Sequence, residues 1–351
     1  MRTPIDRVDC VTEEMPKGRA PSMRDVARIA GVSHQTVSRV INHHPSIRES
    51  TKQRVLAVMD ELQYRPNRAA RALVTSRSNT IGVLAASAAS LYGPASSISA
   101  IEDAARDAGY YVTVAHLGSL DHEDIVAAID HLMAQAVEGV VVVAPQAPVL
   151  EAISAVSIGV PYVTMQTAGV LEGHELSVDQ IAGARKATRH LIDLGHRRIV
   201  HLAGPQDWLE ARARMKGFFD ELDSAGLART EAVLGDWTAD VGYAAGRELL
   251  ADRGVTAVFS SNDQMALGVL HAIRDAGLEV PGDISVVGFD DIPEAAHFWP
   301  PLTTVRQDFG ELGRRCIALL LADIDGVTSP VGEVVQPQLI VRASTAHPPA
   351  R

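Results

Sequence analysis

The feature that most constrains this fold is an alternation of apolar, strand-like segments with helical segments that begins near Thr80. Helical segments of about 10 to 18 residues separate most of the strands, which is typical of parallel α/β sheets. Seven strands exceed one small sheet, so we predict two Rossmann-like lobes with a ligand cleft at the carboxyl ends of their strands. The predicted strands are residues 81–86, 111–117, 138–144, 161–166, 198–204, 256–262 and 284–291.

The net charge of −11 averages over two parts of opposite sign. Residues 17–77 contain 12 Lys and Arg against 4 Asp and Glu, whereas residues 78–351 contain 18 against 35. A basic segment joined to an acidic body indicates where a polyanion such as DNA binds. Residues 1–20 lack periodicity and predict a disordered leader. The sequence shows no signal peptide and no membrane span, and Cys10 and Cys316 have neither disulfide nor metal-ligand spacing, which favours a reducing cytoplasm.

Residues 22–42, SMRDVARIAGVSHQTVSRVIN, have the pattern of a helix-turn-helix. Ser22 and Asp25 form a capping box at the start of a first helix, Gly31 ends that helix, and Ser33 caps a second one. We expect the two helices to pack through Val26, Ile29, Ala30, Val37, Val40 and Ile41.

The polar face of the second helix carries the candidate DNA-reading residues, since Gln can bind adenine and Arg can bind guanine in the major groove. A second capping box, Ser46 with Glu49, predicts a third helix that packs through Val55, Leu56, Met59 and Leu62. A plain three-helix bundle with a solvated face would show the same pattern, but the local positive charge favours DNA binding. The candidate contacts are Ser33, His34, Gln35, Thr36, Ser38, Arg39 and Asn42.

The segment DVARIAGVSHQTVSRVIN, followed by YRPNRAARAL, closely resembles the lactose-repressor (LacI/GalR) family of transcriptional regulators. Further matching segments are LIDLGHRRI, NDQMALG, DISVVGFDD and PPLTTVRQDF, so the likeness extends over residues 22–342. The match is closest to the member that gives the family its name. The resemblance implies a helix-turn-helix head, a hinge helix and a periplasmic-binding-protein-like body of two α/β lobes.

The resemblance also implies that residues 66–73 form a hinge helix that folds only on operator DNA. Leu73 would insert between base steps of the minor groove and kink the DNA, while Asn67, Arg68 and Ala70 would pack against the groove or the partner hinge. An apolar side chain flanked by cations suits this role. A flexible basic linker is the alternative, although the alanine-rich sequence favours a short helix.

A small effector, a sugar or a nucleobase, is implied between the two lobes. Side chains that donate and accept hydrogen bonds, together with aromatic rings, suit a neutral polyhydroxylated ligand. Ala182 replaces an acidic residue of the family's namesake and Glu210 replaces a small hydroxyl residue, which leaves the exact sugar open. The residues carried over are Arg214, Asn262, Asp290 and Gln307 for hydroxyl groups, Trp237 and Phe309 for the apolar ring face, and Leu91, Tyr92 and Glu210 nearby.

These observations predict a sequence-specific transcriptional repressor of carbohydrate-utilisation genes, which a sugar or glycoside inducer releases from its operator DNA. A corepressor-dependent, purine-type repressor of the same family is the alternative. The sequence lacks GxGxxG, Walker, GxSxG and metal-spaced His or Cys motifs, which argues against an enzyme, a cofactor or a metal. A periplasmic sugar-binding protein would need an export signal and would leave the basic head unexplained.

Pro348 and Pro349 follow the last predicted strand and are incompatible with a C-terminal coiled coil, so we expect a homodimer and not a tetramer. The expected location is the cytoplasm, in association with the nucleoid. The predicted parts are a disordered leader (1–20), the helix-turn-helix domain (21–65), the hinge helix and linker (66–78), the effector-binding and dimerisation domain (79–344) and a flexible tail (345–351).

Overall fold

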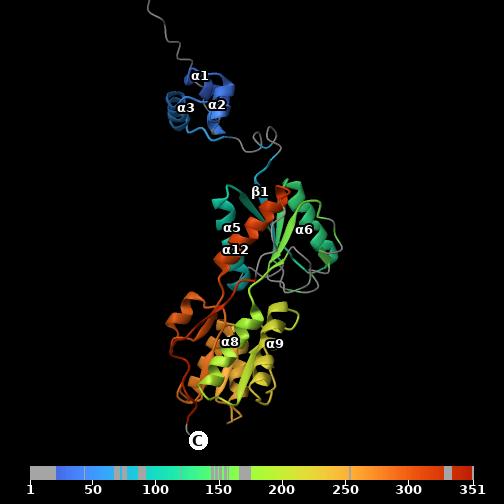
Figure 1. Ribbon diagram of the computed structural model, residues 1–351, viewed down its shortest axis with the longest axis vertical. Helices are drawn as coiled ribbons and strands as arrows, with labels where there is room; N and C mark the ends of the chain where they lie inside the picture. The colour runs from blue at the N-terminus through green and yellow to red at the C-terminus, as the bar shows by residue number, and fades with distance from the viewer. Residues whose placement is uncertain are drawn as a thin grey trace, which may run out of the picture. The chain divides into compact units, whose positions relative to one another are not determined.

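The structure is a computed structural model in which the chain divides into two compact units, residues 1–78 and residues 79–351 (Figure 1). We call the first unit the head and the second the body. Within the described part, no helix is long and apolar enough to span a membrane. The predicted leader, 1–20, lies outside the described residues, which are 21–42, 44–66, 72, 77–85, 92–119, 121–143, 146, 149, 152–153, 156, 158–165, 175–252, 254–327 and 334–349.

Three helices form the head: α1 (Met23–Ile29), α2 (His34–Ile41) and α3 (Glu49–Glu61). The predicted capping box of α1 is confirmed, because the Ser22 N–H donates to Asp25 Oδ2 at 2.9 Å and the Asp25 N–H donates to Ser22 Oγ at 3.4 Å. Gly31 follows α1 with a φ of +64°, a conformation that favours glycine. The buried side chains that hold the helices together are Val26, Ala27, Ala30, Val37, Val40, Val55 and Val58.

The predicted cap of the third helix is wrong. α3 does begin at Glu49, but its N-cap residue is Arg48 and no side chain caps the helix. Ser46 Oγ lies 2.8 Å from His44 Nδ1, so the serine is held by a local turn and is not free to cap the helix.

Two predicted core positions of the head are also wrong, because Leu56 is 44% exposed and Ile29 is 43% exposed. Val58 takes the place of Leu56, since it lies three residues after Val55 and shares the inward face of α3. Leu56 is rotated from Val55 by about 100° around the helix axis. In α1, Ala27 is buried where the sequence favoured Ile29.

The first lobe of the body is a five-stranded parallel sheet in the order β2-β1-β3-β4-β5. Successive side chains of a strand point to opposite faces, so Ile81 and Val83 pack against α5 and α12, whereas Leu84 packs against α6. α12, red in Figure 1, returns to this lobe from the C-terminal part of the chain and lies beside α5. The elements are β1 (Thr80–Ala85), β2 (Tyr111–His116), β3 (Gly139–Val143), β4 (Tyr162–Met165), β5 (Glu175–Leu176), α5 (Tyr92–Asp107), α6 (His122–Ala134) and α12 (Phe309–Ile324).

The second lobe is a four-stranded parallel sheet in the order β7-β6-β8-β9. Phe259 of β8 packs against α8 and α9, whereas the adjacent Val258 faces α10 and α11 on the other side. The elements are β6 (Ile199–Ala203), β7 (Val233–Leu234), β8 (Ala257–Ser260), β9 (Ser285–Val287), α8 (Gln180–Asp193), α9 (Leu209–Ser224), α10 (Ala239–Leu249), α11 (Asp263–Asp275) and a 3-10 helix, η1 (Pro293–His297).

All seven predicted strands are present, although most are shorter than predicted, and the prediction of two α/β lobes is confirmed. Four glycines that follow helices of the body have positive φ angles, a conformation that favours glycine at a helix end. They are Gly109, Gly195, Gly226 and Gly277.

The chain crosses between the lobes three times: after β5, between β10 (Thr304–Arg306) and α12, and between α12 and β11 (Gln338–Ile340). β10 and β11 pair antiparallel. Backbone contacts tie the first and third crossings together, because Val178 bridges Val335 and the Asp179 N–H donates to the Val335 carbonyl at 2.9 Å. The crossings therefore form one connected region between the lobes.

Residues 345–347, which the sequence places in a predicted flexible tail (345–351), contact the second lobe. Thr345 Oγ1 lies 2.9 Å from His190 Nε2. The Ala346 carbonyl lies 2.9 Å from His196 Nε2 and accepts a hydrogen bond from Ser285 Oγ at 3.1 Å. These contacts fasten the segment to the second lobe.

Candidate DNA-binding helix and effector cavity

The polar face of α2 carries the predicted DNA-reading residues of the head. His34, Gln35 and Arg39 are exposed. Gln35 and Arg39 lie four residues apart and so share one face of the helix. Arg39 makes no ion pair with a described residue, which leaves its guanidinium available to a base edge. The predicted hinge contacts, Asn67, Arg68, Ala70 and Leu73, lie outside the described residues.

Three of the predicted DNA-contact residues, Ser33, Thr36 and Asn42, also stabilise the ends of α2. Ser33 is its N-cap residue, and Ser33 Oγ accepts a hydrogen bond from the Thr36 N–H at 3.1 Å. Asn42 ends the helix as its C-cap residue. Asn42 Nδ2 also donates to Ser38 Oγ at 3.5 Å, so the side chains with the fewest structural contacts are His34, Gln35 and Arg39.

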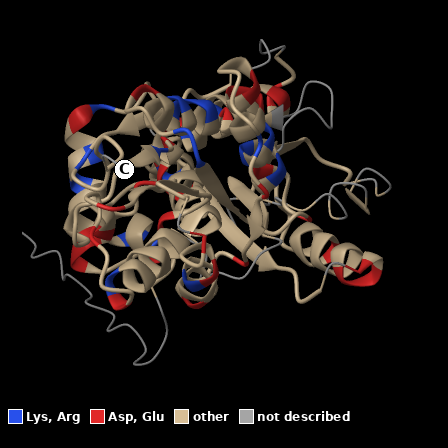
Figure 2. Cartoon of the chain, turned by 90° about the horizontal axis from the view of Figure 1, so that it is seen from below, with Lys and Arg blue, Asp and Glu red and all other residues tan. Residues whose placement is uncertain are grey.

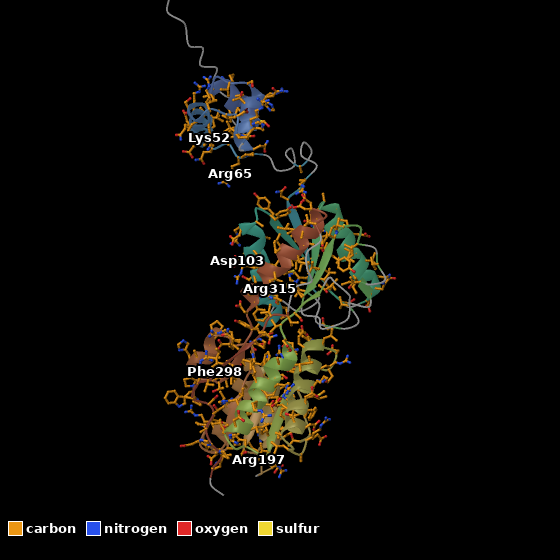
Figure 3. All side chains as sticks on the ribbon, viewed as in Figure 1. Lys52, Arg65, Asp103, Arg197, Phe298 and Arg315 are labelled. Atoms are coloured by element: carbon orange, nitrogen blue, oxygen red, sulfur yellow. The ribbon has the colours of Figure 1, made fainter. Side chains whose placement is uncertain are left out.

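Further cations lie in the head, and Figure 3 labels Lys52 and Arg65 there. Lys52 Nζ lies 3.8 Å from Glu49 Oε2, but the side chains are 40% and 68% exposed, so this pair adds little to stability. Exposed cations of this kind suit phosphate contacts, whose strength falls with added salt. On the helices of the body, acidic and basic residues are mixed (Figure 2).

A cavity lies between the two lobes of the body and contains about 420 Å³ of unfilled space, counting the part that opens to solvent. The first turn of α5 supplies one wall, and the rest of the wall comes from the second lobe and the crossings. The lining residues are Tyr92, Gly93, Pro94, Gln180, Trp208, Glu210, Arg214, Trp237, Asn262, Asp290 and Gln307.

Most of the predicted effector residues meet in this cavity. Leu91 lies outside the described residues. Phe309 does not line the cavity: it is buried in the core of the first lobe and meets Tyr92 edge-on, with the ring centroids 6.1 Å apart. Phe309 therefore supports Tyr92, and the residues that do line the cavity are Tyr92, Glu210, Arg214, Trp237, Asn262, Asp290 and Gln307.

Among the lining residues with a polar or aromatic side chain, Gln180 and Trp208 were not predicted from the sequence. Trp208 lies between β6 and α9, at the carboxyl end of a predicted strand, so the rule that ligands bind at such ends could have identified it. Gln180 is the first residue of α8 and follows β5, a strand of two residues that the apolar pattern does not reveal.

Four buried polar side chains form a closed set of contacts, which we call the polar ring. Arg214 Nε donates to Gln180 Oε1 at 2.8 Å, and Gln180 Nε2 donates to Gln307 Oε1 at 2.7 Å. Gln307 Nε2 donates to Asp290 Oδ1 at 2.7 Å, and that oxygen lies 3.6 Å from Arg214 Nη2. Because Gln180 and Gln307 flank two lobe crossings, the polar ring joins the cavity to the segments between the lobes.

Two indole rings form the aromatic wall of the cavity. The ring centroids of Trp208 and Trp237 lie 5.4 Å apart in an edge-on arrangement, and Arg214 Cζ lies 5.7 Å from the Trp237 ring. Trp237 has a φ of +77°, a strained conformation for a bulky residue. A Cβ on Gly204 would lie 2.1 Å from Trp237 Cη2, so this glycine is needed where the ring packs.

Asn262 lines the cavity, but its side chain also has a structural role. Asn262 Oδ1 accepts from the Met265 N–H at 2.9 Å and caps α11. Asn262 Nδ2 donates to the Trp237 carbonyl and to Gln264 Oε1, both at 3.0 Å. Both amide hydrogens are engaged, so Asn262 holds Trp237 in place more than it offers a donor to an effector.

The adjacent residues Asp290 and Asp291 have different roles. Asp290 belongs to the polar ring and lines the cavity. Asp291 accepts hydrogen bonds from Arg306 Nε and Arg342 Nη2, both at 2.6 Å, and thereby fastens β10 and the segment after β11 to the loop after β9.

Burial raises the pKa of two carboxyl groups in the cavity. The pKa of Asp290 rises to about 6, although Arg214 and the hydrogen bond from Gln307 act in the opposite direction. The pKa of Glu210 rises to about 8, because burial outweighs its own backbone N–H and Arg214. The cavity therefore places one guanidinium beside two carboxyl groups.

A helix-turn-helix head with exposed Gln and Arg, joined to a two-lobed body with a cavity between the lobes, defines a DNA-binding regulator that responds to a small molecule. Residues 22–67 match the family of bacterial regulatory proteins named lacI, and residues 188–345 match a periplasmic binding protein-like domain. The chain belongs to the lacI family, as the resemblance predicted.

Relatives span nearly the whole chain. The HTH-type transcriptional regulator CelR of Thermobifida fusca is 37% identical, over 94% of this chain and 100% of its own length. The lactose operon repressor of Escherichia coli (strain K12) is 35% identical, over 93% of this chain and 91% of its own.

Solved structures agree with this assignment. A Lac repressor dimer bound to operator and the anti-inducer ONPF has a TM-score of 0.83 and 34% identity, over 93% of this chain and 100% of its own. A complex of CelR with cellobiose has a TM-score of 0.69 and 34% identity, over 92% of this chain and 99% of its own.

Proposed function

We propose that this protein represses carbohydrate-utilisation genes by binding operator DNA as a homodimer, and that a sugar or glycoside inducer releases it. The observation that carries the proposal is a cavity lined by the polar ring and two indole rings, in a chain whose head is a helix-turn-helix. Hydroxyl groups suit the polar ring and the apolar face of a sugar suits an indole. The protein acts by binding, without catalysis, at the nucleoid in the cytoplasm.

The proposed DNA contacts follow from the face of α2. One helix reaches few base edges, so two heads related by a two-fold axis would read a pseudo-palindromic operator. Gln35 would pair with adenine and Arg39 with guanine. In the hinge, Leu73 would enter the minor groove beside Asn67, Arg68 and Ala70. The Lac repressor relative was solved as a dimer on operator, which supports this arrangement.

The proposed release mechanism follows from the position of the polar ring. A sugar hydroxyl that bonds to Asp290 or Arg214 competes with the contacts that these residues make with Gln307 and Gln180. Because Gln180 and Gln307 flank the lobe crossings, occupancy of the cavity changes the preferred arrangement of the lobes. A ligand shifts this equilibrium only by its different affinity for the two arrangements, so an inducer binds the DNA-free arrangement more tightly.

A purine-type corepressor is the second candidate function. The observation in its favour is Trp208, a second indole on which a flat base can stack. The HTH-type transcriptional repressor PurR of Haemophilus influenzae is 32% identical over 92% of this chain. The polar ring nevertheless offers carboxylate, guanidinium and amide groups that suit several hydroxyl groups, which favours a sugar.

The test begins with an operator selected from random-sequence DNA by the full-length protein. The protein–operator complex is then titrated with cellobiose, lactose, maltose and hypoxanthine, and DNA binding is followed by fluorescence anisotropy. We expect one of the sugars to release the DNA. Tighter DNA binding with hypoxanthine would favour the corepressor function, and no effect of any sugar would contradict induction.

Two variants assign release to the cavity. Trp208→Ala removes one face of the aromatic wall, and Asp290→Asn removes the carboxylate of the polar ring. Neither residue lies in the head, so operator affinity should stay close to that of the natural protein while release by the sugar is lost. Sugar release that persists unchanged in both variants would place the effector elsewhere.

A further inference from the structure

The polar atoms of the cavity wall are not equally engaged. Glu210 lies in the first turn of α9 and is 6% exposed, yet neither oxygen of its carboxyl group has a hydrogen-bond partner in any other described residue. Its own backbone N–H lies close enough to favour the ionised form. Trp237 Nε1 likewise has no hydrogen-bond partner among the described residues. Buried polar atoms in folded proteins are almost always paired, so these three atoms have bonding capacity that a ligand can use.

The other polar side chains of the cavity already bond to one another. The polar ring occupies Gln180, Arg214, Asp290 and Gln307, and Asn262 is occupied by α11 and Trp237. An effector that bonds to any of these must compete with an existing contact. Bonding to Glu210 displaces no hydrogen bond with another described residue, so Glu210 discriminates between effectors more directly than the polar ring does.

The charge of the cavity adds a second constraint. Asp290 and Arg214 face each other at 3.6 Å, so the guanidinium already has a carboxylate partner. Glu210 is the second carboxyl group, and burial raises its pKa to about 8, with its own backbone N–H and Arg214 lowering it and Asp290 raising it. Near neutral pH the group can therefore both donate and accept hydrogen bonds, in proportions that change with its protonation.

We infer that Glu210 is a specificity-determining residue that selects a neutral effector presenting two adjacent hydroxyl groups, one to each oxygen of its carboxyl group. This inference rests on the proposed function and narrows its ligand class. An ether oxygen of the same effector accepts a hydrogen bond from Trp237 Nε1. Hydroxyl groups suit Glu210 in both protonation states, because each can donate or accept a hydrogen bond.

Charged effectors fit this cavity less well. A phosphate or carboxylate group only accepts hydrogen bonds, and it would meet Glu210 and Asp290 together. An ammonium group only donates hydrogen bonds, so it can pair with Glu210 only in the ionised form of the carboxyl group, which burial disfavours. Sugar phosphates, sugar acids and amino sugars are thus disfavoured relative to neutral sugars.

The test is calorimetric titration of the full-length protein, without DNA, with cellobiose, lactose, maltose, glucose 6-phosphate and glucosamine. Glu210→Ala should weaken binding of the tightest neutral sugar by about 10- to 100-fold, because two hydrogen bonds to a buried carboxyl group are lost. Monodeoxy derivatives of that sugar should reveal two adjacent hydroxyl groups whose removal weakens binding to the natural protein but not to Glu210→Ala.

Control variants separate this effect from a loss of folding. Asp220→Asn changes a partly exposed carboxylate on the same helix and should leave sugar binding unchanged. Both variants should still bind operator DNA. Equal affinity of Glu210→Ala and the natural protein for the sugar, or tighter binding of glucosamine or glucose 6-phosphate than of every neutral sugar, would overturn the inference alone. If no neutral sugar bound to the natural protein, the proposed function would fail and the inference with it.

Discussion

Glu210 makes the stability of the body depend on pH in a way that one substitution removes. Burial raises its pKa from 4.5 to about 8, so between these pH values the folded protein keeps a proton that the unfolded chain releases. The free energy of unfolding therefore falls as pH rises from about 4.5 to about 8 and then levels off. At about 1.4 kcal/mol per pH unit, the change from pH 5.5 to pH 8 lowers it by about 3 kcal/mol.

The assay is urea unfolding of the natural protein and Glu210→Gln at pH 5.5, 7 and 8, without sugar. Trp208, Trp237 and Trp299 all lie in the body, so tryptophan fluorescence reports its unfolding. Glu210→Gln should gain about 3 kcal/mol relative to the natural protein between pH 5.5 and pH 8. Other titrating groups, such as Asp290, are common to both proteins and cancel in the difference.

A matched control is Glu248→Gln, which changes an exposed glutamate on α10. Its unfolding free energy should follow that of the natural protein at every pH. If the curves for Glu210→Gln and the natural protein also ran parallel, Glu210 would not be an isolated buried carboxyl group, and its role in effector selection would lose its physical basis.

Three further substitutions test the head and the cavity. Arg39→Ala should weaken operator binding by about 1–3 kcal/mol and relax specificity at one base position, as measured on a set of operators with single base changes. Gln180→Ala, Gln307→Ala and the double variant should give a coupling energy of about 1 kcal/mol in urea unfolding, whereas additive effects would show that their hydrogen bond contributes nothing. Gly204→Ala should displace the Trp237 ring, because the added methyl group would overlap with it. Sugar binding should then weaken by at least about 10-fold in calorimetry, since the sugar loses its contact with the ring, while operator binding persists.

The sequence predicted the strands of the body because buried parallel strands are short apolar runs that differ plainly from the helices between them. The cavity was predicted in large part for a related reason, since Arg214, Trp237 and Asp290 follow strands whose carboxyl ends face the same side. The resemblance to a known family identified these residues among the others near strand ends.

The remaining residues depend on side-chain direction, which the sequence pattern does not determine. Phe309 begins α12 and turns into the core of the first lobe, although Gln307, two residues before it, faces the cavity. Gln180 follows a strand too short to leave an apolar pattern. The sequence could not show that the buried Glu210 carboxyl group lacks a hydrogen bond from other described residues, because that is a property of the packed structure.

Allosteric repression requires that operator and inducer weaken each other by the same factor, and this reciprocity can be measured directly. The affinity of the full-length protein for the releasing sugar is determined with and without saturating operator, and its operator affinity with and without saturating sugar. We expect both ratios to exceed 5 and to agree within experimental error, corresponding to a coupling free energy of roughly 1–3 kcal/mol. A sugar affinity that is unchanged or increased by operator DNA would contradict induction through the cavity.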